Sequence, residues 1–270
     1  MKRTIPTIIR LFTRHSPRRK LWLDIFMEVG ILGGVYIIYS LSRGSVGKAS
    51  VAFDHAREII DIEKALSIFV EPDIQSFFLE SSLRMDIANS LYTYCYYPPL
   101  ILFAIWAYWR HRPKYKIIRT TFVISAALAF IVFATYPVAP PRFFDGLHGA
   151  ENLGFMDTLV QHWNVDDKSI GAFYNPYAAM PSLHQGWTLM IGAGIIWMTK
   201  SWFGKVIGVS LPIAMFVGIV STANHFVLDA VGGAVILSIS IGLTVLLLKR
   251  LGRYNPKSNS PATPAPITPQ

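Results

Sequence analysis

Six apolar segments of this chain are each long enough to cross a membrane, and they limit its possible folds more than any other feature. A helix needs roughly 18 to 20 apolar residues to span the hydrocarbon core of a bilayer. The shortest segment lies between Pro181 and Lys200, which suit the start and the end of a span. The sequence therefore predicts an all-α integral membrane protein, a six-transmembrane helix bundle with spans at residues 21–41, 87–109, 120–138, 182–199, 206–224 and 226–248.

The composition agrees with this prediction and excludes other classes of protein. Hydrophobic residues make up 52% of the chain and charged residues 15%, against about 25% charged residues in soluble globular proteins. Cys95 is the single cysteine, which excludes a disulfide framework. The cations behind the net charge of +9 flank the apolar segments, so we expect no nucleic-acid partner. The first segment is longer than the h-region of a signal peptide and is expected to remain as an uncleaved span.

The distribution of charge predicts how the spans are oriented. Eighteen of the 25 Lys and Arg residues lie in four regions, 1–20, 110–119, 200–205 and 249–257. By the positive-inside rule these regions are cytoplasmic, so both termini are cytoplasmic and the number of spans is even. The two other links, residues 42–86 and 139–181, hold 13 of the 16 acidic residues and are expected on the extracytoplasmic side.

The first outer link carries a helical pattern of its own. Apolar residues recur at helical spacing opposite acidic ones, and a second short apolar face follows Pro72. The apolar positions are Ile59, Ile62, Leu66 and Phe69, and the acidic ones are Glu58, Asp61 and Glu63. This pattern predicts an outer interfacial helical pair, which either covers the spans or takes part in admitting lipid.

Polar clusters stand at the outer ends of three predicted spans. Residues 137–142 close the third span, 181–184 open the fourth and 225–229 open the sixth. His184 is separated from His225 by one span that crosses inward, a short turn and one span that crosses back. Both rings are therefore expected at the same level of the membrane. The charge rule, which uses neither histidine, places both on the extracytoplasmic side.

The residue types in these clusters suit phosphate chemistry. Asp229 follows His225 by one helical turn, and a carboxylate in an apolar span needs a partner. A carboxylate on one imidazole nitrogen leaves the other as base, nucleophile or ligand. Arg142 offers a planar guanidinium for phosphate, and Ser182 either binds phosphate beside His184 or only caps a helix. Together these residues predict a phosphoryl site.

The same motifs resemble those of a known family. Pro181-Ser182-Leu183-His184 and the His225-to-Asp229 motif are similar to the second and third signature motifs of the type 2 phosphatidic acid phosphatase superfamily. Arg142, within residues 139–142, is similar to the remnant of the first motif. The resemblance implies a six-span helical bundle that extends over the chain apart from its two tails.

The resemblance also implies a role for each residue. His225 corresponds to the nucleophile that forms a phosphohistidine, and Asp229 to the carboxylate that holds and polarises its ring. His184 corresponds to the acid that protonates the leaving group and then activates water or a hydroxyl. Arg142 and Ser182 correspond to the phosphate-binding residues. No metal or other cofactor is implied.

The chain departs from the typical phosphatase pattern at two cationic positions. Thr135 and Ile219 stand where such members carry a lysine and an arginine, and Leu183 replaces a frequent glycine. In these respects the chain is similar to the branch with inositol phosphorylceramide synthases and sphingomyelin synthases. Fewer cations suit a phosphodiester better than a phosphate monoester.

We therefore expect a lipid phosphotransferase or phosphatase in the cell membrane, with its site facing the extracytoplasmic side. Its substrate is a lipid phosphate or phospholipid, and the acceptor is water or an alcohol such as inositol. The expected parts are a basic tail (1–20), a catalytic membrane domain (21–250) and a disordered tail (251–270). Two alternatives remain open. One is a proton-coupled transporter or lipid scramblase, and the other is a zinc site made of His184, His225 and Asp229.

Overall fold

The structure is a computed structural model that describes residues 17–41, 49–146, 150–163 and 176–251. The chain divides into two compact units, residues 1–44 and 45–270. The expected disordered tail lies outside the described residues apart from residue 251, as do residues 1–16 of the expected basic tail. The described part of the first unit is the helix α2 (Pro17–Leu41), which contains the whole first predicted span.

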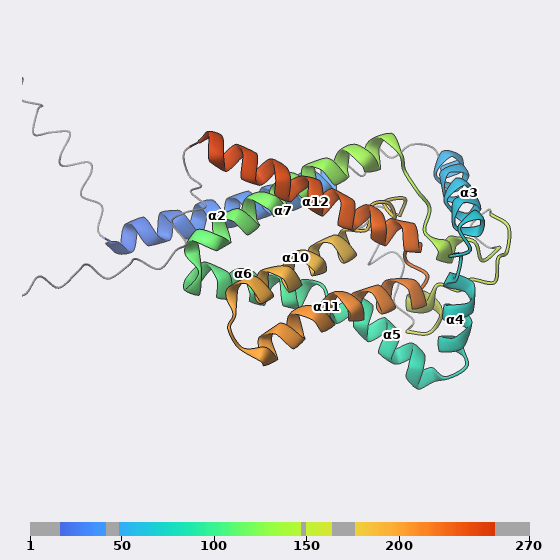
Figure 1. Cartoon of the computed structure of the whole chain (residues 1–270). Helices are drawn as coiled ribbons and strands as arrows, with labels where there is room; N and C mark the ends of the chain where they lie inside the picture. The colour runs from blue at the N-terminus through green and yellow to red at the C-terminus, as the bar shows by residue number, and fades with distance from the viewer. Residues whose placement is uncertain (1–16, 42–48, 147–149, 164–175, 252–270) are drawn as a thin grey trace, which may run out of the picture. The chain divides into compact units, whose positions relative to one another are not determined.

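Within its described residues the second unit is built of helices joined by loops, with isolated β-bridges (Figure 1). Its helices are α3 (Ala49–Ala65), α4 (Glu71–Leu79), α5 (Ser82–Tyr94), α6 (Tyr97–Arg110), α7 (Arg112–Thr135), the short 3₁₀ helix η2 (Pro141–Phe143), α8 (Thr158–Gln161), α10 (Leu183–Met198), α11 (Trp202–Ser221) and α12 (Val227–Arg250).

The second predicted span is not one continuous helix. The segment 87–109 is divided between α5 and α6, which break at Cys95 and Tyr96. Proline causes the break, because Pro98 and Pro99 lack the N–H groups that a helix continuing from α5 would need. In the first turn of a new helix the same residues are well tolerated.

Three of the described helices are long and apolar enough to cross a membrane. They are α7, α11 and α12. The helix α10 is equally apolar in character but has 16 residues, fewer than a straight span needs. The protein is therefore all-helical with at least these candidate spans, and the six-span count remains a prediction.

The helix α10 holds a central place in the second unit. It packs against α6, α7, α11 and α12 (Figure 1). Its crossing with α12 is close because a glycine lies on each side: a Cβ added to Gly186 would lie 2.9 Å from the carbonyl oxygen of Gly233. A Cβ on Gly233 would overlap the carbonyl oxygen of Ser182. Small residues of this kind let helix backbones touch, and here they bring the first turns of α10 and α12 together.

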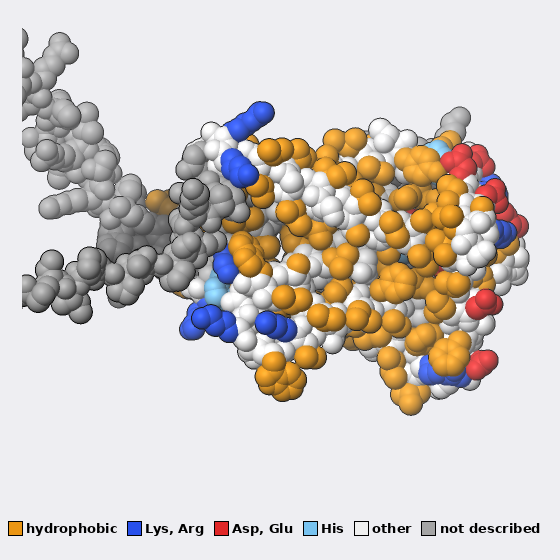
Figure 2. All heavy atoms as spheres, viewed as in Figure 1, with side chains coloured by type: hydrophobic (Ala, Val, Ile, Leu, Met, Phe, Trp, Pro, Cys, Tyr) orange, Lys and Arg blue, Asp and Glu red, His pale blue; other side chains and the backbone are white. Residues whose placement is uncertain are grey.

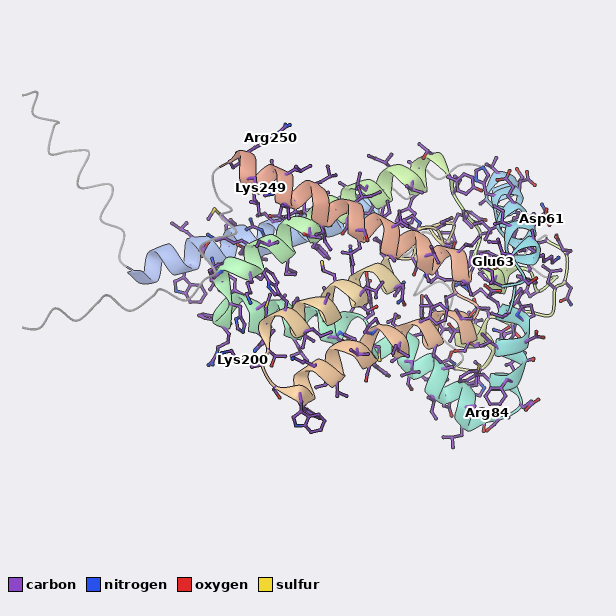
Figure 3. All side chains as sticks on the ribbon, viewed as in Figure 1. Asp61, Glu63, Arg84, Lys200, Lys249 and Arg250 are labelled. Atoms are coloured by element: carbon purple, nitrogen blue, oxygen red, sulfur yellow. The ribbon has the colours of Figure 1, made fainter. Side chains whose placement is uncertain are left out.

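The two ends of the second unit carry opposite charge. Acidic side chains gather at the end with α3 and α4, and Lys and Arg gather at the other end (Figure 2). Figure 3 shows Asp61 and Glu63 at one end and Lys200, Lys249 and Arg250 at the other, while Arg84 is a cation at the mainly acidic end. The apolar surface between the ends has the character of a lipid-facing belt, since Ile105, Ile131, Val209 and Val235 are all exposed.

The outer helical pair exists as α3 and α4, but the predicted faces of α3 are partly wrong. Ile59 is buried, whereas Ile62 and Leu66 are exposed, and Phe69 lies beyond the end of α3. Glu63, which the pattern placed on the polar face, is fully buried. The reason is that its carboxyl oxygen accepts a hydrogen bond from the backbone N–H of Leu228 in α12.

Gly233→Ala is expected to lower the stability of the protein. The added methyl group must push α10 away from α12, and overpacking of this kind costs about 1–3 kcal/mol. Thermal unfolding in detergent measures the effect. Gly242→Ala is the matched control on the same helix, because a Cβ there meets no atom within 4 Å. Equal stability of the two variants would show that the helices do not need this close crossing.

Candidate active site

Two histidine rings from separate helices meet in the second unit. His225 Nε2 lies 3.3 Å from His184 Nδ1, and the ring centroids are 5.5 Å apart. His184 lies in the first turn of α10, and His225 lies between α11 and α12. The structure thus brings together the two histidines that the sequence analysis placed at one level.

The hydrogen bonds of His225 fix which of its nitrogens carries the proton. Nδ1 lies 2.8 Å from the carbonyl oxygen of Ala179. A carbonyl oxygen only accepts, so Nδ1 donates and the neutral ring has its lone pair on Nε2. Nε2 is the nitrogen that faces His184. The ring therefore presents a nucleophilic nitrogen to the site.

Asp229 supports this ring in a different way from the one expected. Its Oδ2 lies 3.5 Å from His225 Nδ1, further than the Ala179 carbonyl, and accepts a 2.8 Å hydrogen bond from the backbone N–H of Phe226. Asp229 is fully buried. The carboxylate thus caps the start of α12 and lies at ion-pair distance from the ring, while Ala179 makes the direct hydrogen bond.

Arg142 lies at the same site and is held on three sides. Its backbone N–H donates to the carbonyl of Ala223, and its Nη1 donates to Asn224 Oδ1. Its Nε lies 2.9 Å from Asp157 Oδ2, in an ion pair whose two side chains are nearly buried. Ala223 and Asn224 directly precede His225, so these bonds hold Arg142 beside the site. The guanidinium therefore belongs to the site, with its charge offset by Asp157.

Ser182 is the N-cap of α10. Its hydroxyl oxygen accepts from the backbone N–H of Gln185 at 3.3 Å, and its own N–H donates to the carbonyl of Asp229 at 2.9 Å. The side chain is fully buried. The capping role, one of the two interpretations of this residue, is thus present. The hydroxyl hydrogen is not used by the cap and can point to a phosphate oxygen.

Sequence reasoning missed several residues that shape the site. Tyr92 and Tyr96 pack on the His184 ring, with centroid distances of 5.0 and 4.3 Å. Asp157 pairs with Arg142, and Glu63 and Glu71 reach the start of α12. These five residues come from segments remote from the motifs, and no spacing in the sequence connects them to the histidines.

The two positions that lack the expected cations have ordinary structural roles. The Thr135 hydroxyl donates to the carbonyl of Ile131 within α7 and lies on an exposed part of that helix. Ile219 is fully buried, and its carbonyl accepts from the N–H groups of Asn224 and His225. Neither position adds positive charge to the site.

The residues proposed as zinc ligands have other partners here. Asp229 bonds to the backbone, and His225 to Ala179 and His184. Within the described ranges, no three His, Cys, Asp or Glu side chains are arranged to hold a metal ion.

Comparison with known proteins gives one match. Residues 57–243, more than half of the chain, match the PAP2 superfamily. The chain belongs to the PAP2 superfamily. No curated protein and no solved structure matches it significantly. The matched residues run from α3 to α12 and include both histidines, Arg142, Ser182 and Asp229.

Membership of the PAP2 superfamily agrees with the general class expected from the motifs. Its members are generally lipid phosphatases or phosphotransferases, so the chain is assigned to this class of membrane enzyme. A lipid phosphate substrate and association with a membrane follow from the same membership. The resemblance to the inositol phosphorylceramide synthase and sphingomyelin synthase branch is a finer statement and remains a prediction.

Ser182→Ala is expected to destabilise this PAP2-superfamily protein. Alanine removes the acceptor for the Gln185 N–H group, and the loss of such an N-cap costs about 1 kcal/mol. Ser182→Gly is expected to cost only a few tenths of a kcal/mol, because glycine is accepted at N-caps. Thermal unfolding of both variants measures the difference. Unchanged stability of Ser182→Ala would mean that the hydroxyl does not cap α10.

Proposed function

We propose that this protein transfers a phosphoryl-containing group from a membrane lipid to water or an alcohol through a covalent intermediate on His225. One observation carries the proposal. His225 Nδ1 is committed to the Ala179 carbonyl, so the lone pair on Nε2 faces His184, a ring able to carry a proton. A nucleophile and an acid in contact are what two-step phosphoryl transfer requires.

In the first step, His225 Nε2 forms a bond to phosphorus while the bond from phosphorus to the leaving oxygen breaks. His184 gives a proton to that oxygen. Before this step the substrate has to separate the two rings, because the 3.3 Å contact leaves no room for phosphorus between them. The positive charge on the phosphorylated His225 ring is stabilised by Asp229 at 3.5 Å.

In the second step, the oxygen of water or of an alcohol attacks the same phosphorus. His184 takes the proton from this oxygen, and the electron pair of the bond between nitrogen and phosphorus returns to Nε2. Arg142 and the Ser182 hydroxyl stabilise the phosphate oxygens in both steps. No metal or cofactor takes part in the proposed steps.

The charge of the site supports a donor of low charge. The Arg142 guanidinium is paired with Asp157, and Thr135 and Ile219 add no cation. A phosphodiester carries one negative charge where a phosphate monoester carries up to two, so it needs less compensation. We therefore propose a phosphodiester lipid as donor and an alcohol such as inositol as acceptor, in keeping with the synthase branch.

We further propose that the protein spans the cell membrane six times with its site on the extracytoplasmic side. The separation of charge between the two ends of the second unit supports this orientation (Figure 2). The cationic end is the one that the positive-inside rule assigns to the cytoplasm. Glu63, in contact with α12 beside the site, lies at the acidic end (Figure 3).

His225→Ala is expected to lower phosphate or head-group transfer at least about 1,000-fold, because it removes the nucleophile. The assay uses defined lipids labelled at phosphorus and scores both the product and an acid-labile label on the protein. His111→Ala is the control, since His111 lies at the cationic end between Arg110 and Arg112. Full activity or undiminished labelling in the His225 variant would refute the assignment.

Asp157→Asn is expected to shift selectivity toward phosphate monoesters. Asparagine keeps an oxygen for the N–H groups of Leu159 and Val160 but removes the charge that offsets Arg142. The ratio of kcat/KM for phosphatidate to that for a phosphodiester lipid should rise about tenfold, which is about 1.4 kcal/mol. Asp73→Asn, at an exposed position of α4, is the control. An unchanged ratio would show that Asp157 does not set the charge preference.

A further inference from the structure

Three carboxyl groups from three helices meet at the start of α12. Glu63 Oε1 accepts from the backbone N–H of Leu228 at 2.7 Å, and Glu71 Oε1 accepts from that of Val227 at 2.7 Å. Asp229 Oδ2 accepts from that of Phe226 at 2.8 Å. Three successive backbone donors, which a helix leaves without internal partners, are thus satisfied by buried acids.

Two of these acids carry a buried oxygen without a partner. Glu63 and Glu71 are fully buried and accept from adjacent backbone N–H groups, yet the Oε2 atom of each has no hydrogen-bond partner among the described residues. Carboxylates have no hydrogen to donate, so two ionised groups here leave both oxygens unsatisfied and repel each other. A proton on one of the two carboxyl groups supplies the missing donor.

The electrostatic surroundings agree with a shared proton. Burial, followed by the nearby carboxylates of Glu71 and Asp229, raises the pKa of Glu63 from 4.5 to about 9. Burial likewise raises the pKa of Glu71, against the lowering effect of its bonds to Val227 and Glu63. Glu63 on α3 and Glu71 on α4 thus face each other, and Asp229 on α12 is the third acid beside them.

We propose that Glu63 and Glu71 are positioning residues for the reaction at His225, and that their shared proton holds the first turn of α12 in place. His225 directly precedes the segment whose N–H groups the two acids bind. Loss of the shared proton leaves two buried carboxylates beside Asp229. Their repulsion loosens the first turn of α12 and with it the His225 ring. The activity part of this inference rests on the proposed function.

The geometry predicts different outcomes for single and double substitutions. In Glu63→Gln the amide oxygen accepts from Leu228 and the amide N–H donates to Glu71, so every bond is kept without a titrating proton. We expect kcat within about threefold of the original value. In the double variant Glu63→Gln/Glu71→Gln, two NH₂ groups face each other and one hydrogen bond is lost. We expect kcat to fall about tenfold or more, with KM little changed.

The pH profile separates positioning from simple stabilisation. The original protein should lose kcat as pH rises through about 9, where Glu63 gives up its proton. Glu63→Gln should lack this alkaline limb. Asp61→Asn, an exposed acid on the same helix (Figure 3), is the matched control and should keep it. An unchanged kcat in the double variant, or an alkaline limb in Glu63→Gln identical to the original one, would overturn the inference.

Unfolding gives a test that does not depend on activity. Because the folded state binds the Glu63 proton more tightly than the unfolded state, stability should fall as pH rises from about 4.5 to about 9. Glu63→Gln should remove this part of the slope, and an identical slope would contradict the shared proton. Activity that survives His225→Ala would refute the proposed function instead, whatever the unfolding slope.

Discussion

The close crossing of α10 and α12 is the constraint on which the site depends. Gly186 and Gly233 let the two backbones touch, and the Ser182 N–H group bonds to the Asp229 carbonyl at the same place. Both helices start there, so the residues at their starts become neighbours. In an apolar surrounding every backbone N–H group at these starts needs a partner, and Ser182, Asp229, Glu63 and Glu71 supply them.

Much of the fold could be predicted from hydropathy, because apolar length is a strong signal for helices in lipid. The helices α7, α11 and α12 lie where apolar segments predicted them. The division of the second predicted span into α5 and α6 could not be predicted, because hydropathy does not register the effect of Pro98 and Pro99 on the helix. The predicted faces of α3 were partly wrong because a hydropathy pattern treats every acidic residue as exposed to solvent. Glu63 is instead buried against a backbone N–H group of α12.

The site could be predicted in part, and for a definite reason. His184, His225 and Asp229 belong to short motifs at the outer ends of predicted spans, so topology alone brought the histidines to one level. The partners of these residues could not be predicted. The Ala179 carbonyl that orients His225 is backbone, and Asp157 reaches Arg142 from a separate loop. Tertiary contacts of this kind leave no periodic trace in a sequence.

The contact between His184 and His225 has a consequence for the proposed reaction. The lone pair on His225 Nε2 already has a neighbour, His184 Nδ1 at 3.3 Å. In the proposed reaction a lipid phosphate has to move the His184 ring away before phosphorus can reach this nitrogen. Substrate binding and exposure of His225 Nε2 are then coupled, which limits reaction of the nitrogen with other electrophiles.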